Sequence, residues 1–508
     1  MPDVLKERSE MDPRYQWDLS TLYADDDAWE AAFAAIDSKL GDVPAMQGTL
    51  NTAENIRRYL EVSYAVECEI ENLFCYASLR RSEDTRAEKA QSMIARAHSK
   101  LVQYFARVAW AEPEILALPE DQLQALVEDP LLADYKFILT KLLRRQPHTL
   151  SAAEEQLLAG LGEVFGAPRD ISSSLMDADM VFDPVTDAEG QSHELSGSNY
   201  ILLQSSDDRT LRENAFRSFY KSYRQHSNTL AAAYSGAVKG AVAEARARHY
   251  ESSRAMSLAG AHIPISVYDN LVETVHKHMP AMYRYVALRK KLLKLPELHY
   301  YDVYAPLVKG SEKQYSYEDA QELVLNAVAP LGENYVNVVR SAFRDNWIDV
   351  YPNKGKRGGA FSSGTYDSNP YILTNFTGTL DSVSTIAHEM GHSLHSWHSH
   401  QNQPYHYAGY TLFVAEVAST VNENLLIEQL LAKTSDPAER LVLLNQYLEN
   451  FKGTVYRQTM FAEFEREAHA MAERGEALSP SALNALYKRL ILEYFGPDMV
   501  WDDEVAYE

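Results

Sequence analysis

Apolar residues recur every three or four positions along most of the chain, and this is the spacing of amphipathic helices. The stretch from Ile56 to Arg81 is one example. Further stretches with the same period are 101–117, 152–164, 268–295, 439–451 and 483–495. The 32 tyrosines fit this picture as packing residues between helices. The pattern predicts a large, mainly α fold.

Two segments interrupt the helical period. From Met180 to Ser198, the pairs Asp-Pro and Glu-Gly punctuate a short apolar run, which predicts a hairpin. We expect a domain boundary just after it, giving domains 1–200 and 201–508. The second segment, 354–379, is rich in Gly, Ser, Thr and Asn. Within it, Tyr371–Phe376 has the composition of a short strand, so we expect a small β element there.

The net charge of −24 narrows the classes of partner. An acidic surface repels phosphate backbones and anionic lipid headgroups, so we expect neither nucleic acid nor membrane as a partner. No run approaches the ~18 consecutive apolar residues of a membrane span. The first residues, Met1 to Trp17, lack the apolar core of a signal peptide. The sequence does not determine the oligomeric state.

Only two cysteines occur, Cys68 and Cys75, seven residues apart in a predicted helix. That spacing separates them by about two turns, which is too far for a disulfide. A disulfide framework is therefore excluded, and the reducing cytoplasm is the simplest location.

A group of histidines forms a candidate metal-binding motif. Six of the 16 histidines lie between His388 and His406, and His388-Glu389-Met-Gly-His392 has the form His-Glu-x-x-His. Residues four apart share one helix face, so two imidazoles can bind one ion at ~2.0–2.1 Å. Glu389 is rotated off that line and can act as general base on a metal-activated water. We expect Asp381 to cap this helix.

A catalytic zinc takes three protein ligands, so a third must be found. His395 shares the histidine face, but it lies ~10 Å along the helix axis from His388. We favour Glu416, from a following helix, because apolar neighbours surround it in sequence and burying its carboxylate would be costly without a cation. Glu423 remains the rival. Glu416 can also be read as part of an exposed polar stripe.

Several blocks of the sequence resemble the oligoendopeptidase F branch of the thimet-oligopeptidase-like zinc metallopeptidases. The zinc motif is one of them, within His388–His395, and the resemblance spans nearly the whole chain. The other blocks are Tyr15–Tyr23, Lys356–Phe361, Pro370–Phe376, Phe413–Ser419 and Arg457–Glu465.

The resemblance implies a helical fold with two lobes around a deep substrate channel. It implies endopeptidase action on oligopeptides, because a narrow channel excludes folded proteins. Family members continue past the Tyr494–Asp498 region into a segment whose His and Tyr side chains face the zinc. The chain ends at Glu508, so we expect those donors to lie outside this sequence.

Four further residues are candidates for substrate contact. His406 and Tyr410 lie between the two predicted ligand helices and could approach the reacting carbonyl. Gly358 and Gly359 would permit close approach of a peptide or movement of their loop. The strand at 371–376 could pair with an extended peptide through main-chain hydrogen bonds. Each of these residues can equally be a loop or turn residue.

Three alternatives remain open at this point. A metallocarboxypeptidase would use the same zinc motif. A di-iron carboxylate protein is possible because Glu273-x-x-His276 and Glu389-x-x-His392 are both Glu-x-x-His pairs on predicted helices. A peptide-binding protein with a structural metal would bind peptides without cleaving them. Metal content and the cleavage of a peptide with a blocked C-terminus distinguish these alternatives.

Overall fold

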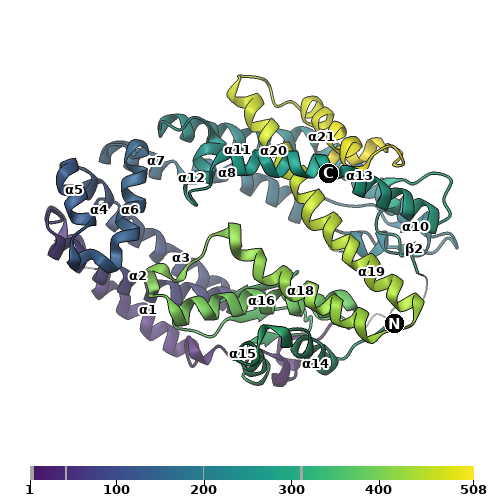
Figure 1. Ribbon diagram of the computed structural model, residues 1–508, viewed down its shortest axis with the longest axis horizontal. Coiled ribbons are helices and arrows are strands. Elements are labelled where there is room, and N and C mark those ends of the chain that lie inside the picture. Colours follow the sequence, from purple (N-terminus) through teal and green to yellow (C-terminus); the bar gives the residue numbers. More distant parts are fainter. Residues whose placement is uncertain (1–4, 41–42, 198, 309–312) are drawn as a thin grey trace. The chain divides into compact units, whose positions relative to one another are not determined.

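Helices dominate the protein. The computed structural model describes residues 5–40, 43–197, 199–308 and 313–508 (Figure 1). Strands in this part of the chain form only two small sheets. The prediction of a mainly α fold is confirmed. None of the described helices combines the length and apolar character needed to cross a membrane.

Contacts divide the chain into two compact units, each built from two stretches of sequence. Unit 1 comprises Met1–Ala152 and Glu312–Lys433, and unit 2 comprises Ala153–Ser311 and Thr434–Glu508. The predicted boundary near residue 200 falls inside unit 2, because the elements that follow it pack with the last helices of the chain. The predicted substrate channel stays a prediction.

Unit 1 is organised around two pairs of long helices, α2 with α3 and α16 with α18. Its α-helices are α1 (Asp26–Leu40), α2 (Ala53–Glu83), α3 (Glu88–Val108), α4 (Ala111–Leu116), α5 (Glu120–Val127), α6 (Lys136–Arg145), α14 (Tyr317–Ala327), α15 (Glu333–Arg344), α16 (Leu380–Asn402), α17 (Tyr405–Ala408) and α18 (Leu412–Lys433). Its 3-10 turns are η1 (Arg8–Glu10), η2 (Pro13–Tyr15), η3 (Leu19–Thr21), η4 (Pro44–Met46), η5 (Pro130–Tyr135), η6 (Gln146–His148) and η9 (Ala329–Leu331).

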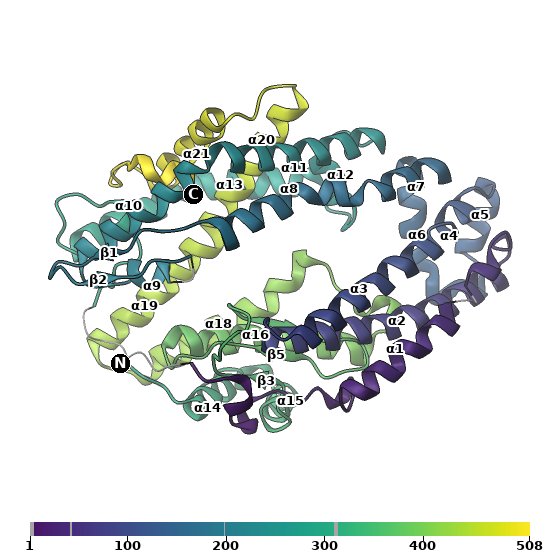
Figure 2. The same cartoon turned by 180° about the vertical axis from the view of Figure 1, so that it is seen from behind.

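A three-stranded sheet in unit 1 packs against α16. Its strands are β3 (Ile348–Asp349), β4 (Phe361–Ser363) and β5 (Tyr371–Leu373), in the order β3-β5-β4. Figure 2 labels β3 and β5. β5 pairs parallel with β3 and antiparallel with β4, with Ser362 opposite Ile372. The predicted strand 371–376 therefore exists in its first half, and its residues are fully buried at the centre of the sheet.

Unit 2 is a layered group of helices with a small hairpin. Its helices are α7 (Ala152–Gly160), α8 (Gly162–Ser174), α9 (Tyr200–Gln204), α10 (Arg209–Gln225), α11 (Ser227–Ala247), α12 (Ser253–Ala259), α13 (Ile265–Leu292), α19 (Pro437–Phe451), α20 (Gln458–Glu473) and α21 (Pro480–Phe495). Short 3-10 helices are η8 (Tyr300–Asp302) and η11 (Asp503–Tyr507), and short π-helical segments are η7 (Leu175–Asp179) and η10 (Lys452–Arg457). The predicted hairpin is β1 (Val185–Thr186) with β2 (Ser192–His193).

The helical period located most of the long helices well. The predicted stretches at 56–81, 268–295, 439–451 and 483–495 correspond to α2, α13, α19 and α21. The stretch at 101–117 is instead divided, because α3 ends at Val108 and α4 begins at Ala111. Ile115 and Leu116 on α4 are buried in the core beside α2, so the apolar period continues across a change in helix direction.

Candidate metal centre

The helix that carries the histidine pair, α16, begins at Leu380, about two turns before His388. Thr379 caps α16, because its backbone is extended and its hydroxyl accepts a hydrogen bond from the N–H of Ser382. The sequence predicted Asp381 as the cap, and that prediction is wrong. Asp381 lies in the first turn of α16, where its negative charge still complements the helix dipole.

The packing of α16 against α18 fixes the position of the centre. Val383, Ile386 and Met390 are fully buried on the apolar face of α16. Gly391 allows the two helices to approach closely, because a Cβ atom there would lie 2.6 Å from the carbonyl oxygen of Ala418. The Asn422 amide on α18 donates a hydrogen bond of 3.1 Å to the carbonyl oxygen of Ala387. These contacts set the register between the helices.

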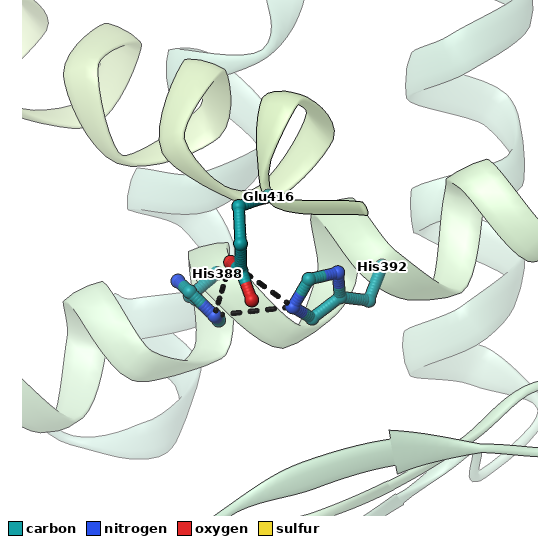
Figure 3. Close-up of side chains that lie close together, drawn as sticks. All are labelled: His388, His392 and Glu416. Carbon is teal, nitrogen blue, oxygen red and sulfur yellow. Dashed lines mark hydrogen bonds and ion pairs between the residues drawn. The ribbon is translucent and has the colours of Figure 1, made fainter. Parts of the chain in front are cut away.

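The structure brings together His388, His392 and Glu416 (Figure 3). The Nε2 atoms of the two histidines are 3.2 Å apart. Oε2 of Glu416 lies 3.4 Å from Nε2 of His388 and 3.5 Å from Nε2 of His392. Figure 3 shows the Glu416 side chain reaching from α18 toward the two rings on α16.

This spacing suits a single small cation. Zinc ligands lie ~2.0–2.1 Å from the ion, so ligand atoms at the corners of a tetrahedron are about 3.3 Å apart. The three observed separations of 3.2, 3.4 and 3.5 Å agree with that value. Two imidazole nitrogens and one carboxylate oxygen are also a donor set that zinc accepts. The residues present therefore fit a zinc ion.

The other two candidate ligands lie elsewhere. Glu423 contacts the opposite nitrogen of His388, with Oε1 2.6 Å from Nδ1. It therefore orients the ring and leaves Nε2 to face the group of three. Among the described residues, one cluster of side chains could hold a metal ion, and His395 does not belong to it. Its ring stacks on Tyr410 with 3.6 Å between the ring centroids.

Glu389 lies on the same helix as the two histidines, and its surroundings shift its pKa. Its side chain is buried beside the metal-facing histidines, and it accepts a hydrogen bond from the backbone N–H of Ser362 on β4. Burial raises the pKa of Glu389 to about 7, and the positive charge of His388 opposes this rise. A carboxyl group with a pKa near neutrality can both accept and release a proton at physiological pH.

The two histidines differ in their electrostatic surroundings. Burial by itself lowers the pKa of His388, but the hydrogen bond with Glu423 and the nearby carboxylates outweigh it, so that its pKa is raised. The pKa of His392 is lowered, chiefly by burial. A cation bound by these rings competes with their protons.

The surroundings of Glu416 differ from those that the sequence suggested. Its side chain is 54% exposed, and the flanking Phe413 and Val417 are 62% and 60% exposed. The expected burial among apolar neighbours is therefore wrong, because those neighbours point away from the packed side of α18. The packed side consists of Ala415, Ser419, Asn422 and Leu426.

The four predicted substrate-contact residues are placed in different surroundings. Tyr410 donates or accepts a hydrogen bond of 2.9 Å with Ser396 on the metal-facing helix. His406 is held on α17 by ring contacts with Tyr64 and Tyr135 and by the carbonyl of Asp134. Gly358 and Gly359 form a loop before β4, and Gly359 has a positive φ of 78°. Their contact with substrate stays a prediction.

Sequence reasoning missed three residues that support the centre. Ser419 is fully buried and donates a hydrogen bond of 2.6 Å to Oε2 of Glu416. Asn422 ties α18 to α16, and Ser362 supplies the N–H that faces Glu389. The signal that could have identified Ser419 and Asn422 is their helical spacing from Glu416, at three and six residues.

The di-iron alternative requires Glu273 and His276 to join the same centre. His276 lies on α13 in unit 2, and its two ring nitrogens contact different carboxylates. Nε2 is 2.7 Å from Glu463, and Nδ1 is 3.1 Å from Glu493. Neither Glu273 nor His276 belongs to the three-residue group found among the described residues. The geometry therefore favours a single ion.

Comparison with known proteins agrees with this geometry. The family model for peptidase family M3 matches residues 202–508, and the oligopeptidase F model matches residues 114–182. The chain belongs to peptidase family M3. It is therefore a metalloendopeptidase, and the resemblance inferred from its sequence blocks is confirmed.

Relatives within the M3 family match almost the full length of the chain. Oligopeptidase PepF of Bacillus subtilis is 41% identical, over 99% of this chain and 76% of its own length. Group B oligopeptidase PepB of Streptococcus agalactiae is 40% identical, over 96% of this chain and 82% of its own.

Solved structures of M3-like proteins share the fold. The crystal structure of oligoendopeptidase-F from Enterococcus faecium is 35% identical, with a TM-score of 0.72 over 95% of this chain and 82% of its own. A crystal structure from Chlamydophila abortus is 34% identical, with a TM-score of 0.85 over 99% of this chain and 86% of its own.

Proposed function

We propose that this M3 peptidase is a zinc-dependent endopeptidase that hydrolyses internal bonds of oligopeptides. The observation that carries the proposal is the tetrahedral spacing of three donor atoms from His388, His392 and Glu416. When bound there, zinc supplies Lewis-acid chemistry, which acidifies a water molecule and polarises the scissile carbonyl. The names of the relatives, oligopeptidase and oligoendopeptidase, support the substrate class.

The role proposed for Glu389 is proton transfer. Its carboxylate takes a proton from the attacking water and delivers it to the nitrogen of the leaving amine. The Glu389 side chain is buried where α16 packs against β4, and this packing restricts its movement. The hydrogen bond from the Ser362 N–H orients the carboxylate without occupying both of its oxygens.

The main chain of the substrate has a candidate binding edge on β4. The sequence suggested that the strand at 371–376 pairs with peptide, but β5 already has a strand on each side. β4 has a single strand partner in the described sheet, so its outer edge can accept an added strand. The hydrogen bond between the Ser362 backbone and Glu389 supports a substrate position close to the proposed base.

We also propose that the protein is cytoplasmic and that it binds neither nucleic acid nor membrane. Cys68 and Cys75 are both free thiols, which fits the cytoplasm. The net charge of −24 supports a protein without nucleic acid or membrane partners.

The decisive experiment is mass spectrometry of a quenched oligopeptide digested with and without a chelator. We expect an internal cut that the chelator abolishes and that added zinc restores. A Glu389→Gln variant should bind zinc like the parent and lose at least ~100-fold in kcat, because general-base catalysis contributes at least that much. The exposed Glu428 on α18 provides a matched control, and Glu428→Gln should cleave like the parent.

Two results would contradict the proposal. Cleavage by Glu389→Gln at a rate near that of the parent would exclude Glu389 as the base. Loss of cleavage when the free C-terminus of the peptide is blocked would identify a carboxypeptidase instead of an endopeptidase.

A further inference from the structure

A patch of exposed apolar side chains lies at the beginning of α18. It consists of Phe413, Val414, Val417 and Val421, and we call it the α18 patch. Phe413 and Val417 are 62% and 60% exposed. Contiguous exposed apolar surface on a protein marks a binding site more often than chance.

The α18 patch is confined to the turns that carry Glu416. Further along the same side of the helix, the exposed residues are Asn424 and Glu428. Since an α-helix turns by ~100° per residue, Phe413, Val417 and Val421 lie about 60° to 140° around the axis from Glu416. One side of α18 thus packs on α16, the next presents the carboxylate, and the third presents the patch.

The internal packing of unit 1 does not use this surface. Ala415, Ser419 and Asn422 make the buried side of α18, and Asn422 bonds directly to α16. A polar patch would serve the fold equally well and would be more soluble, as Asn424 and Glu428 illustrate one and two turns further on. Packing within the described part of unit 1 therefore does not account for the apolar character of these positions.

The proposed reaction would bring a peptide close to this surface. A peptide whose scissile carbonyl lies at Glu416, His388 and His392 must place its neighbouring residues within one or two residue lengths, each ~3.3 Å. Phe413 and Val417 are the helix neighbours of Glu416 on its open side. We propose, on the basis of the proposed function, that the α18 patch is the subsite for a large apolar side chain beside the scissile bond, with Phe413 and Val417 determining specificity.

The test compares two quenched peptides that differ only in one residue beside the cut, leucine in one and serine in the other. The parent should cleave the leucine peptide with the higher kcat/KM. Phe413→Ser and Val417→Ser should each lower kcat/KM for the leucine peptide by about tenfold and leave that for the serine peptide within about twofold. Val417→Leu keeps an apolar side chain at this position and should therefore keep the parent's preference for the leucine peptide. All variants should bind zinc like the parent.

Binding gives a readout that is independent of turnover. In a Glu389→Gln background, calorimetry should show that Val417→Ser raises the Kd of the leucine peptide about tenfold and leaves the Kd of the serine peptide unchanged. Val102→Ser on α3 is the matched control, because Val102 is 55% exposed in the same unit. It should change neither Kd.

The possible outcomes separate this inference from the proposed function. If the parent cleaves neither peptide, or cleaves both in the presence of chelator, the proposed function fails. If the parent cleaves both with zinc but the patch variants keep its leucine-to-serine ratio, only the subsite is overturned. Equal losses for both peptides, or a parent dimer that Val417→Ser separates into monomers, would show that the patch contacts protein instead of substrate, and would also overturn it.

Discussion

At the scale of single residues, the two nitrogens of His388 have different tasks. Nδ1 is engaged by Glu423 at 2.6 Å, so Nε2 is the atom that faces His392 and Glu416. Carboxylate partners of this kind fix the tautomer of a metal-binding histidine and raise its basicity. We therefore expect Glu423 to influence metal binding through His388.

Glu423→Gln should weaken zinc binding without abolishing it. The amide keeps the size of the side chain and loses its charge, so we expect zinc affinity to fall about 10- to 100-fold. Competition with a chromophoric zinc chelator measures this. Affinity within twofold of the parent would show that the Glu423 carboxylate has no such effect.

Glu416→Ala should lower zinc occupancy far more than His395→Ala. The first change removes one of the three clustered donor atoms, whereas His395 lies outside the cluster and stacks on Tyr410. Metal analysis of the two purified variants measures this difference. The opposite order of zinc contents would make His395 the third ligand.

At the scale of elements, the centre depends on how closely α16 and α18 approach. Gly391 lies one residue before His392, directly beneath the backbone of Ala418 and Ser419. The contact places the Glu416 turn over the histidine pair, and Asn422 fixes its position along the axis. A small change in this distance is transmitted directly to the donor atoms.

Gly391→Ala should therefore damage both stability and metal binding. The added Cβ would meet the carbonyl oxygen of Ala418 at 2.6 Å, and backbone atoms must move to relieve the clash. We expect a loss of about 1–3 kcal/mol in the free energy of unfolding. Chemical denaturation and zinc analysis measure the two effects.

Gly453→Ala provides the control, because a Cβ at Gly453 has no atom within 4 Å. Stability of Gly391→Ala equal to that of the parent would show that the helices separate without cost.

At the scale of the whole molecule, buried charges join distant parts of the sequence within unit 1. Asp349 on β3 is fully buried between two cations, Lys356 and Arg8. Nζ of Lys356 lies 2.6 Å from Oδ1 of Asp349, and Nη2 of Arg8 lies 2.5 Å from Oδ2. Arg8 also lies 3.5 Å from Glu83 at the end of α2. The N-terminal segment, α2 and the sheet are thus held by one network.

Asp349→Asn should destabilise unit 1 strongly. It leaves the buried ammonium of Lys356 without its counter-ion, and breaking a buried pair in this way costs about 3–5 kcal/mol. Urea denaturation followed by circular dichroism measures this loss. The exposed pair of Lys39 and Glu69 is the control, and Glu69→Gln should leave the midpoint unchanged. Equal midpoints for Asp349→Asn and the parent would show that the network does not stabilise the unit.

The sequence by itself determined the helices and the chemistry of the histidine pair. Helical period depends on residues a few positions apart, so α2, α13, α19 and α21 could be located without tertiary information. The relation between His388 and His392 is equally local, because a four-residue spacing in a helix fixes their common face.

The sequence favoured Glu416 as the third ligand, but only the tertiary structure brought Glu416 to the two histidines and Glu423 to the opposite nitrogen of His388. Glu416 and Glu423 lie on the same helix, and the choice between them depends on which turn of α18 faces α16. That register is set by Gly391 and Asn422 across a helix interface, and no local pattern encodes it. The same interface turned Phe413 and Val417 outward, although their apolar character had suggested burial. Apolar periodicity shows that a helix has an apolar side, but contacts between distant segments decide what covers it.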